Sequence, residues 1–345
     1  MSLIDLVYPK YKTISIVGTS KNAGKTVTMN HIITEAAERG ITLGLISTGR
    51  DGERRDVLTN TEKPAVFASK GSIITTVENS LGNVAESERA GIEILEVTGY
   101  NTPMGKVVVG KVLEPGNVEI SGPRSSTTIK QMCYMMQDFG ANLVLVDGSL
   151  DRRASAAPFV SDGTIIATGA ALSRTMDIVL QKTKHLVSLY SIPEADDIIL
   201  EIAACAVKNK ETVIVDMEGN CFTVCSQTSL NIGAAIADQL TDRSKYVILS
   251  GSATFDTLKD IVLSKRNKLQ IIVKDATRIF VNENELFMLN KMGMELRTIK
   301  ALNIIAVTVN PYSPEGYYFD PEEFLQKMRE AIPNVPVMDV MQNEI

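Results

Sequence analysis

The sequence predicts an α/β fold: a doubly wound, mostly parallel sheet with a β insertion, plus a second, smaller α/β domain. A glycine-rich loop joins a short apolar run at residues 13–17 to a long helix-forming segment. The uniformly apolar runs at 143–146 and 164–167 are typical of parallel strands that are buried on both faces. Strand-like and helix-like segments also alternate through the second half of the chain, as they do in α/β domains.

The first half begins with a strand, a loop and a helix. Residues 13–17 (TISIV) are rich in β-branched side chains, which favour a strand. Residues 25–39 are predicted to form a helix that ends at Gly40, since glycine readily adopts the left-handed conformation of a helix C-terminus. The next apolar run, at 41–47, is the second predicted strand.

The pattern changes between residues 92 and 120. Short β-like pieces (IEILEV, GKVVVGKVL and NVEI) are separated by the turn-forming strings GYNTP and EPG. We therefore expect an antiparallel β insertion at about 92–120, on one edge of the first domain. It would either carry contacts to a partner or substrate, or simply extend the sheet.

A second alternation starts near residue 210. Its strand-like runs lie at 212–216, 246–249, 270–273 and 304–308, with helical segments at 231–239 and 254–263 between them. Residues 172–209 are mostly helical and are expected to connect the two halves. These patterns place a first domain, which contains the glycine-rich loop, at 1–209 and a second α/β domain at 210–345.

Composition excludes several classes of function. The chain has 345 residues, a net charge of −6 and no block of Lys and Arg, so we expect no nucleic-acid partner. It contains no run of 18 apolar residues, and its start lacks the apolar core of a signal peptide. We therefore expect no membrane association and a cytoplasmic location.

The cysteines and histidines do not suggest a catalytic or metal site. Cys133 and Cys205 lie in apolar, helix-like surroundings and are expected to be reduced, buried thiols. Cys221 and Cys225 are four residues apart, but the second cysteine pair that a structural zinc site needs is missing from the sequence. The two histidines lie within predicted helices, so nucleophilic triad catalysis is not expected.

The glycine loop has the form of a nucleotide-binding P-loop. It reads GTSKNAGKT from Gly18 to Thr26, between a predicted strand and a predicted helix, which is the context the motif requires. Lys25 would bind the β and γ phosphates of ATP or GTP and take part in catalysis, and Thr26 would ligate Mg²⁺. Backbone N–H groups of the loop and of the helix N-terminus would face the phosphates. The predicted nucleotide-binding residues are Gly18, Lys21, Asn22, Ala23, Gly24, Lys25, Thr26 and Val27.

A carboxylate is needed to orient Mg²⁺. The string LVLVDGSLDR delivers Asp147 at the end of an apolar strand, where ligands bind in open α/β sheets. We assign Asp147 a catalytic and metal-binding role. Asp151 and Arg152 are weaker candidates, since a solvated turn explains them equally well.

The segment after the second strand, STGRDGERRD, is a second candidate element of the site. Asp51 or Glu53 could hold Mg²⁺ or orient the attacking water, and Arg50 could contact phosphate. Asp51 is the residue we assign to catalysis and metal binding. A solvated charged loop is the alternative. Small polar turns at Thr98–Gly99 and Thr168–Gly169 either border the ligand or are simple turns.

The spacing within the loop departs from the strict P-loop pattern. Thr19 stands where that pattern has its first glycine, and Gly18 is one residue earlier. This longer spacing resembles the loop of dethiobiotin synthetase and related deviant P-loop NTPases. In many of those relatives an extra loop lysine reaches the nucleotide of a dimer partner, so the resemblance implies a possible homo-oligomer. Lys21 is of the right residue type for this role but not at the signature spacing.

Several strings together resemble one bacterial family over most of the chain. IVGTSKNAGKT, STGRDGE, EVTGYNTPMG, VDGSLDRRASAAP and YVILSGSATFDTLKDIV are similar to the P-loop subunit of the reactivase for lysine 5,6-aminomutase and ornithine aminomutase, enzymes that use adenosylcobalamin. The resemblance implies an ATPase in lysine degradation that releases damaged cofactor. Its implied partners are the aminomutase and a MutS-like ATPase subunit. Two alternatives remain: a ligase or small-molecule kinase of the dethiobiotin synthetase type, and a nucleotide-binding scaffold without hydrolysis.

Overall fold

The computed structural model describes residues 2–48, 66–82, 84–123, 125–148, 159–225, 231–264 and 268–341. The chain divides into two compact units. The first comprises residues 1–183 and 303–345, and the second comprises residues 184–302. Among the described residues, no helix is long and apolar enough to cross a membrane.

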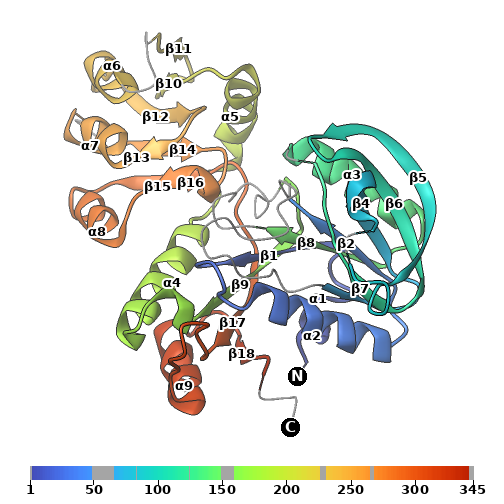
Figure 1. Ribbon diagram of the computed structural model, residues 1–345. Helices are drawn as coiled ribbons and strands as arrows, with labels where there is room; N and C mark the ends of the chain where they lie inside the picture. The colour runs from blue at the N-terminus through green and yellow to red at the C-terminus, as the bar shows by residue number, and fades with distance from the viewer. Residues whose placement is uncertain are drawn as a thin grey trace. The chain divides into compact units, whose positions relative to one another are not determined.

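The described part of the first unit is built on a nine-stranded sheet with the order β18-β17-β9-β1-β8-β2-β4-β6-β5 (Figure 1). All neighbouring strands from β18 to β4 are parallel, whereas β4, β6 and β5 are antiparallel. The sheet strands are β1 (Thr13–Gly18), β2 (Leu43–Ser47), β4 (Ile73–Val77), β5 (Gly91–Thr102), β6 (Gly105–Glu114), β8 (Leu143–Gly148), β9 (Gly163–Gly169), β17 (Ile304–Asn310) and β18 (Val337–Asp339). A separate antiparallel pair is formed by β3 (Val66–Ala68) and β7 (Gly116–Val118). The α-helices are α1 (Leu3–Val7), α2 (Lys25–Glu38), α3 (Ser126–Asp138), α9 (Pro321–Ala331) and α4 (Met176–Tyr190), of which the part up to Thr183 belongs to this unit.

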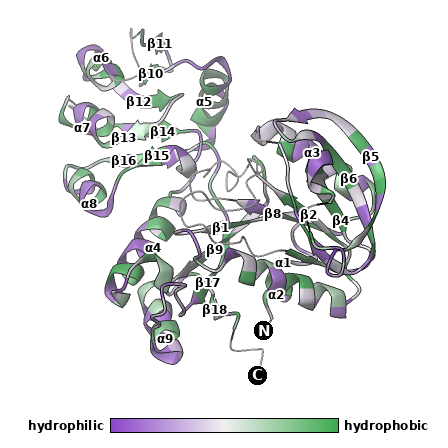
Figure 2. Ribbon diagram, viewed as in Figure 1, coloured by the Kyte–Doolittle hydropathy of each residue, from purple (hydrophilic) through white to green (hydrophobic). Residues whose placement is uncertain are grey.

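Helices cover both faces of this sheet, as a doubly wound fold requires. Successive strand residues point to opposite faces. Leu143 and Leu145 of β8 therefore pack in one core with Ile32 of α2, whereas Val144 and Val146 pack in the other with α3. Figure 2 shows the apolar residues concentrated along the central strands and on the helices that cover them. Burial on both faces explains why these strands are apolar throughout.

The predicted antiparallel insertion is present at the edge of the sheet. β5 and β6 form a long ribbon, which pairs with the rest of the sheet through β4. Gly110 of β6 lies opposite Ile94 of β5, and an added Cβ at Gly110 would lie only 2.5 Å from Cγ2 of Ile92. The absence of a side chain at this position therefore lets the ribbon strands pack closely.

The described part of the second unit has a five-stranded sheet with the order β11-β10-β12-β14-β16. β12, β14 and β16 are parallel, whereas β10 is antiparallel to both of its neighbours. Its elements are α5 (Asp197–Asn209), β10 (Val213–Asp216), β11 (Cys221–Thr223), α6 (Ile232–Gln239), β12 (Ser244–Leu249), β13 (Ala253–Thr254), α7 (Phe255–Ser264), β14 (Gln270–Val273), β15 (Ile279–Phe280), α8 (Glu283–Lys291) and β16 (Glu295–Thr298). α5 contributes Ile199 and Ala203 to the core of this unit, so it is part of the second unit and not a connector.

The division of the chain differs from the one predicted at residue 209. The segment at 304–308 was expected in the second domain, but it forms β17 and pairs with β9 in the first sheet. Val307 lies opposite Ile166, and Ala306 is fully buried in the core beneath α2. The second unit is therefore inserted between β9 and β17, and the chain then returns to the first unit. An apolar strand pattern shows that a segment lies in a sheet, but it does not show in which one.

Candidate functional site

The glycine loop lies between β1 and α2, as the sequence predicted. Gly18 ends the strand, and Lys25 is the first residue of the helix. Gly24 has a φ of +100°, a conformation that residues with a side chain rarely adopt. Asn22 has a φ of +59°, a left-handed conformation that asparagine tolerates better than most residues. The loop thus turns sharply at two positions just before the helix begins.

The N-terminus of α2 is suited to bind an anion. Gly24 has no side chain that could accept a hydrogen bond from the first-turn N–H groups, and the first turn contains no acidic residue. The helix dipole places partial positive charge at this end, and Lys25 adds a full positive charge. The ammonium of Lys25 donates a hydrogen bond to the carbonyl oxygen of Gly148, 3.2 Å away at the end of β8. The lysine therefore reaches across the ends of two adjacent strands.

Strand alternation directs three polar side chains to the face that α2 covers. Residues two apart in a strand point to the same face of the sheet, so Ser47 points to the same face as Leu45 of β2, and Asp147 to the same face as Leu145 of β8. Both leucines pack in the core beneath α2. On β17, the hydroxyl of Thr308 is 2.7 Å from that of Thr28 on α2, so Thr308 faces this helix. Asn310 is two residues later in the strand and points to the same face. Since these strands are parallel, their carboxyl ends lie along one edge of the sheet, next to the glycine loop.

Asp147 is held in place by the neighbouring strand. It lies opposite Ser47 in the register of β8 and β2, and the Ser47 hydroxyl donates to its Oδ2 over 3.4 Å. The backbone N–H of Thr48 donates to its carbonyl oxygen over 3.0 Å. The side chain is partly exposed at the end of the strand. A carboxylate in such a position can ligate Mg²⁺ directly or through a water molecule.

Asn310 also borders the loop, although no sequence motif predicted it there. An added Cβ at Gly24 would lie 3.0 Å from the Cβ of Asn310. An added Cβ at Gly169 would lie 2.2 Å from the carbonyl oxygen of Asn310, so β9 must have a glycine at this position. The side-chain oxygen of Asn310 accepts a hydrogen bond from the backbone N–H of Tyr312 over 3.0 Å. This interaction leaves the side-chain amide group of Asn310 next to the loop.

The other predicted loop residues have different surroundings. Lys21 and Asn22 are exposed, whereas Ala23 is 1% exposed and has no polar side-chain atom, so its backbone is the only part that could form a hydrogen bond with a ligand. Val27 packs against the core beneath α2, which leaves its backbone N–H as its contribution to the helix N-terminus. Thr26, at the start of α2, is partly exposed.

Of the two small polar turns, neither offers its threonine hydroxyl to a ligand. The hydroxyl of Thr98 donates to the carbonyl of Val107 within the β5–β6 ribbon over 2.8 Å. The side chain of Thr168 is fully buried. The predicted residues Arg50, Asp51, Glu53, Asp151 and Arg152 lie outside the described residues.

The cysteines differ partly from expectation. Cys133 is buried as predicted, and burial raises the pKa of its thiol to about 12. Cys205 was also expected to be buried but is exposed, as are Cys221 and Cys225. Within the described ranges, no three His, Cys, Asp or Glu side chains are grouped so that they could hold a metal ion.

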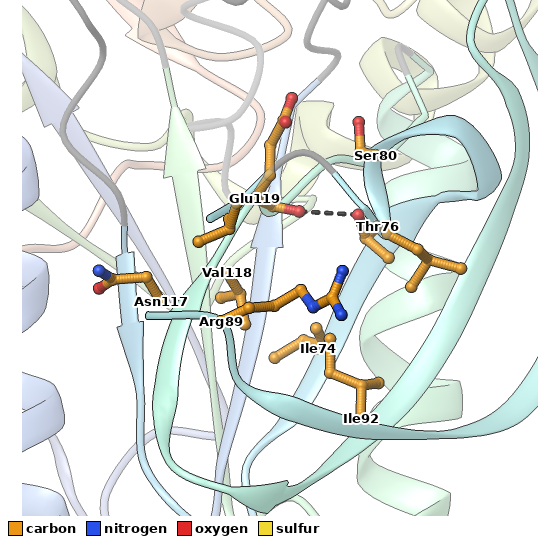
Figure 3. Close-up of a pocket in the computed structure, with 10 residues that line it drawn as sticks. Ile74, Thr76, Ser80, Arg89, Ile92, Asn117, Val118 and Glu119 are labelled. Atoms are coloured by element: carbon orange, nitrogen blue, oxygen red, sulfur yellow. Dashed lines mark hydrogen bonds between the residues drawn. The ribbon is translucent and has the colours of Figure 1, made fainter. Parts of the chain in front are cut away.

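A small hollow lies in the edge region, beside β4 and the segment that leads to β5. Ile74 and Thr76 of β4, Arg89, Ile92 and Glu119 are among the residues that line it. Figure 3 shows the Arg89 side chain extending across this hollow and the Thr76 hydroxyl donating to the carbonyl of Glu119, a hydrogen bond of 2.7 Å. The hollow is a feature of the β insertion and contains none of the glycine-loop residues.

The fold and this edge of the sheet define an α/β protein with a glycine loop between its first sheet strand and the following helix. The chain matches no protein-family model, and no curated protein matches its sequence significantly.

Proposed function

We propose that this protein binds a nucleoside triphosphate, ATP or GTP, together with Mg²⁺ at the glycine loop. One observation carries the proposal: the uncapped N-terminus of α2 and Lys25 lie at the edge of the sheet where Asp147 is the last residue but one of the adjacent strand, β8. Phosphate is the ligand that such a combination of backbone N–H groups, helix dipole and lysine favours. An aspartate on the neighbouring strand supplies the oxygen ligand that Mg²⁺ prefers.

Each residue then has a defined task. The N–H groups at the start of α2 bind phosphate oxygens, and Lys25 exchanges its hydrogen bond to Gly148 for the β and γ phosphates. Thr26 and Asp147 hold Mg²⁺, and Ser47 orients the Asp147 carboxylate. The bound Mg²⁺ would neutralise charge that develops on the phosphates during hydrolysis. Asp51, in the segment after β2, remains our candidate for orienting the attacking water.

We propose further that nucleotide turnover serves to reactivate an adenosylcobalamin-dependent aminomutase by releasing damaged cofactor. The sequence resemblance to the reactivase family supports this role, and the aminomutase and a MutS-like ATPase subunit are the implied partners. The β5–β6 ribbon lies outside the nucleotide site and exposes the apolar side chains of Ile94, Val97 and Leu113, which a partner protein could cover.

Nucleotide binding is tested by titrating the full chain with ATP or GTP in a calorimeter, with and without Mg²⁺. Lys25→Ala should weaken binding at least tenfold, because it removes a charge-assisted contact to phosphate. Lys12→Ala is a matched control, since Lys12 is an exposed lysine just before the opposite end of β1. Equal affinities of the wild type and the Lys25 variant would refute the assignment of the site.

The biological role needs a second assay. Aminomutase inactivated by turnover is incubated with fresh adenosylcobalamin, nucleotide and the wild-type protein, with and without the second ATPase subunit. Recovery of mutase activity should require nucleotide and should be lost with Lys25→Ala. A wild-type protein that binds nucleotide but restores no activity would exclude the reactivase role and leave nucleotide binding intact.

The spacing of the loop, with five residues between its two glycines, favours a second candidate. This spacing resembles that of dethiobiotin synthetase, so the γ-phosphoryl group could activate a carboxylate for ligation. ADP production that depends on a small carboxylic acid, in the absence of any protein partner, would support this reading.

A further inference from the structure

Three buried threonine hydroxyls form a continuous chain from the glycine loop to α4. The Thr19 hydroxyl donates to that of Thr168 over 3.0 Å, and the hydroxyls of Thr168 and Thr183 are 2.8 Å apart. The exposed fractions of these residues are 8%, 0% and 0%, so water does not replace the contacts. Each residue belongs to a different element: the loop, the end of β9 and α4.

The hydrogen-bond chain has a natural direction. Since Thr19 donates to Thr168, Thr168 can use its own proton toward Thr183, and each hydrogen bond then polarises the next. The backbone N–H of Thr19 also donates to the carbonyl of Ala167 over 2.9 Å. The first turn of the loop is therefore fixed to β9 by both its backbone and its side chain, and the Thr168 hydroxyl that anchors the side chain is itself in hydrogen-bond contact with Thr183.

Thr183 also has a distinctive place in the chain. α4 runs from Met176 to Tyr190, and Thr183 is its last residue in the first unit, because the second unit begins at Lys184. The same helix thus carries the end of the hydroxyl chain and the start of the second unit. A ligand that orders the loop would strengthen the chain, and by reciprocity the state of α4 would change the affinity of the loop for that ligand.

We propose that Thr183 is a positioning residue for the nucleotide loop, and that it couples occupancy of the loop to α4 through Thr168 and Thr19. The nucleotide part of this inference rests on the proposed function above. The positioning part concerns the loop itself and holds with or without nucleotide.

The test compares Thr183→Val, which removes the hydroxyl at nearly constant volume, with Thr183→Ser, which keeps it. Thr164→Val is the matched control. Thr164 lies on β9, as Thr168 does, and forms a buried hydroxyl contact of 2.8 Å with Ser15 of β1, at the end of β9 away from the loop. Thr183→Ala replaces the valine variant if that variant does not fold. Folding is checked by circular dichroism.

Two measurements are made on the full chain. Calorimetry with Mg²⁺ and ATP should give weaker binding for Thr183→Val, by at most about tenfold, since a binding loss cannot exceed the energy of the one buried hydrogen bond removed, and near wild-type binding for the serine and Thr164 variants. Hydrogen exchange should show that nucleotide protects the amides of residues 184–190 in the wild type, but not in Thr183→Val. Without nucleotide, the loop amides at residues 19–24 should exchange faster in Thr183→Val than in Thr164→Val.

The outcomes separate the two proposals. If the wild type binds no nucleotide, the proposed function fails, and faster loop exchange in Thr183→Val still supports the positioning role. If the wild type binds nucleotide, unchanged affinity in Thr183→Val would overturn the coupling. Loop exchange that is equal in Thr183→Val and Thr164→Val would overturn the positioning role in either case.

Discussion

Replacement of Gly24 by alanine should destabilise the first unit by two separable effects. Gly24 has a φ of +100°, and forcing alanine into a left-handed conformation costs about 1–2 kcal/mol. Its new Cβ would also lie 3.0 Å from the Cβ of Asn310, closer than carbon atoms normally approach. Overpacking of this kind costs about 1–3 kcal/mol, so the total loss should be about 2–5 kcal/mol.

Gly140 provides the matched control. Its φ is +102°, almost the same as that of Gly24, but an added Cβ would meet no atom within 4 Å. Gly140→Ala should therefore show only the conformational cost of about 1–2 kcal/mol. The two variants share the same change in the entropy of the unfolded chain, so their difference isolates the contact with Asn310.

Urea unfolding followed by circular dichroism measures these differences, since the chain contains no tryptophan. Removing the opposing Cβ with Asn310→Gly should restore part of the stability of Gly24→Ala, whereas the same change should not rescue Gly140→Ala. Equal losses in the two alanine variants, or no rescue by Asn310→Gly, would refute the close packing of β17 against the loop.

Two further predictions follow from protonation. Because burial raises the pKa of the Cys133 thiol to about 12, this thiol should not react with a thiol reagent at pH 8 until urea unfolds the protein. The other three cysteines are exposed and should react at once, and rapid reaction of all four thiols would contradict the prediction. Hydrogen bonds from Arg39 and Ser2 lower the pKa of Asp5, so its ionised form stabilises the fold above the ordinary carboxyl range, and this contribution is lost as the pH falls through the lowered pKa. Asp5→Asn should therefore lower the urea midpoint at pH 6 more than at pH 3, and a difference that does not depend on pH would count against the ion pair.

Local patterns were sufficient to predict the first strand, the loop and α2. The strand is a short β-branched run, the helix ends at Glu38, two residues before Gly40 with its φ of +66°, and both signals lie within a few residues of the elements they define. The same holds for β8 and for Asp147 at its end. Burial on both faces makes such strands apolar throughout, and the first polar residue then marks the edge of the sheet.

The part of the site on β17 could not be predicted in this way. Asn310 is a single asparagine before a proline, and no local motif sets it apart. It borders the loop for two reasons. After an insertion of more than 100 residues, the chain returns to the first unit and β17 pairs with β9, and the alternation of side chains along β17 directs Asn310 to the face covered by α2. Both causes are non-local, so the sequence pattern of residues 304–310 fits either sheet equally well.

The topology explains why the site and the second unit are connected. β1 and β9 are neighbours in the sheet, but the chain leaves them in opposite directions. From β1 it continues through α2 to β2, which lies on the β8 side of β1, and from β9 it leads to β17, which lies on the other side of β9. Connections that leave adjacent strands in opposite directions open a crevice at their carboxyl ends, where α/β proteins bind ligands. The second unit is inserted in the β9–β17 connection, so it begins just after the strand whose Ala167 carbonyl accepts the Thr19 N–H. If the loop binds nucleotide as proposed, a change in the loop would therefore act on β9 and α4, the elements that lead into the second unit.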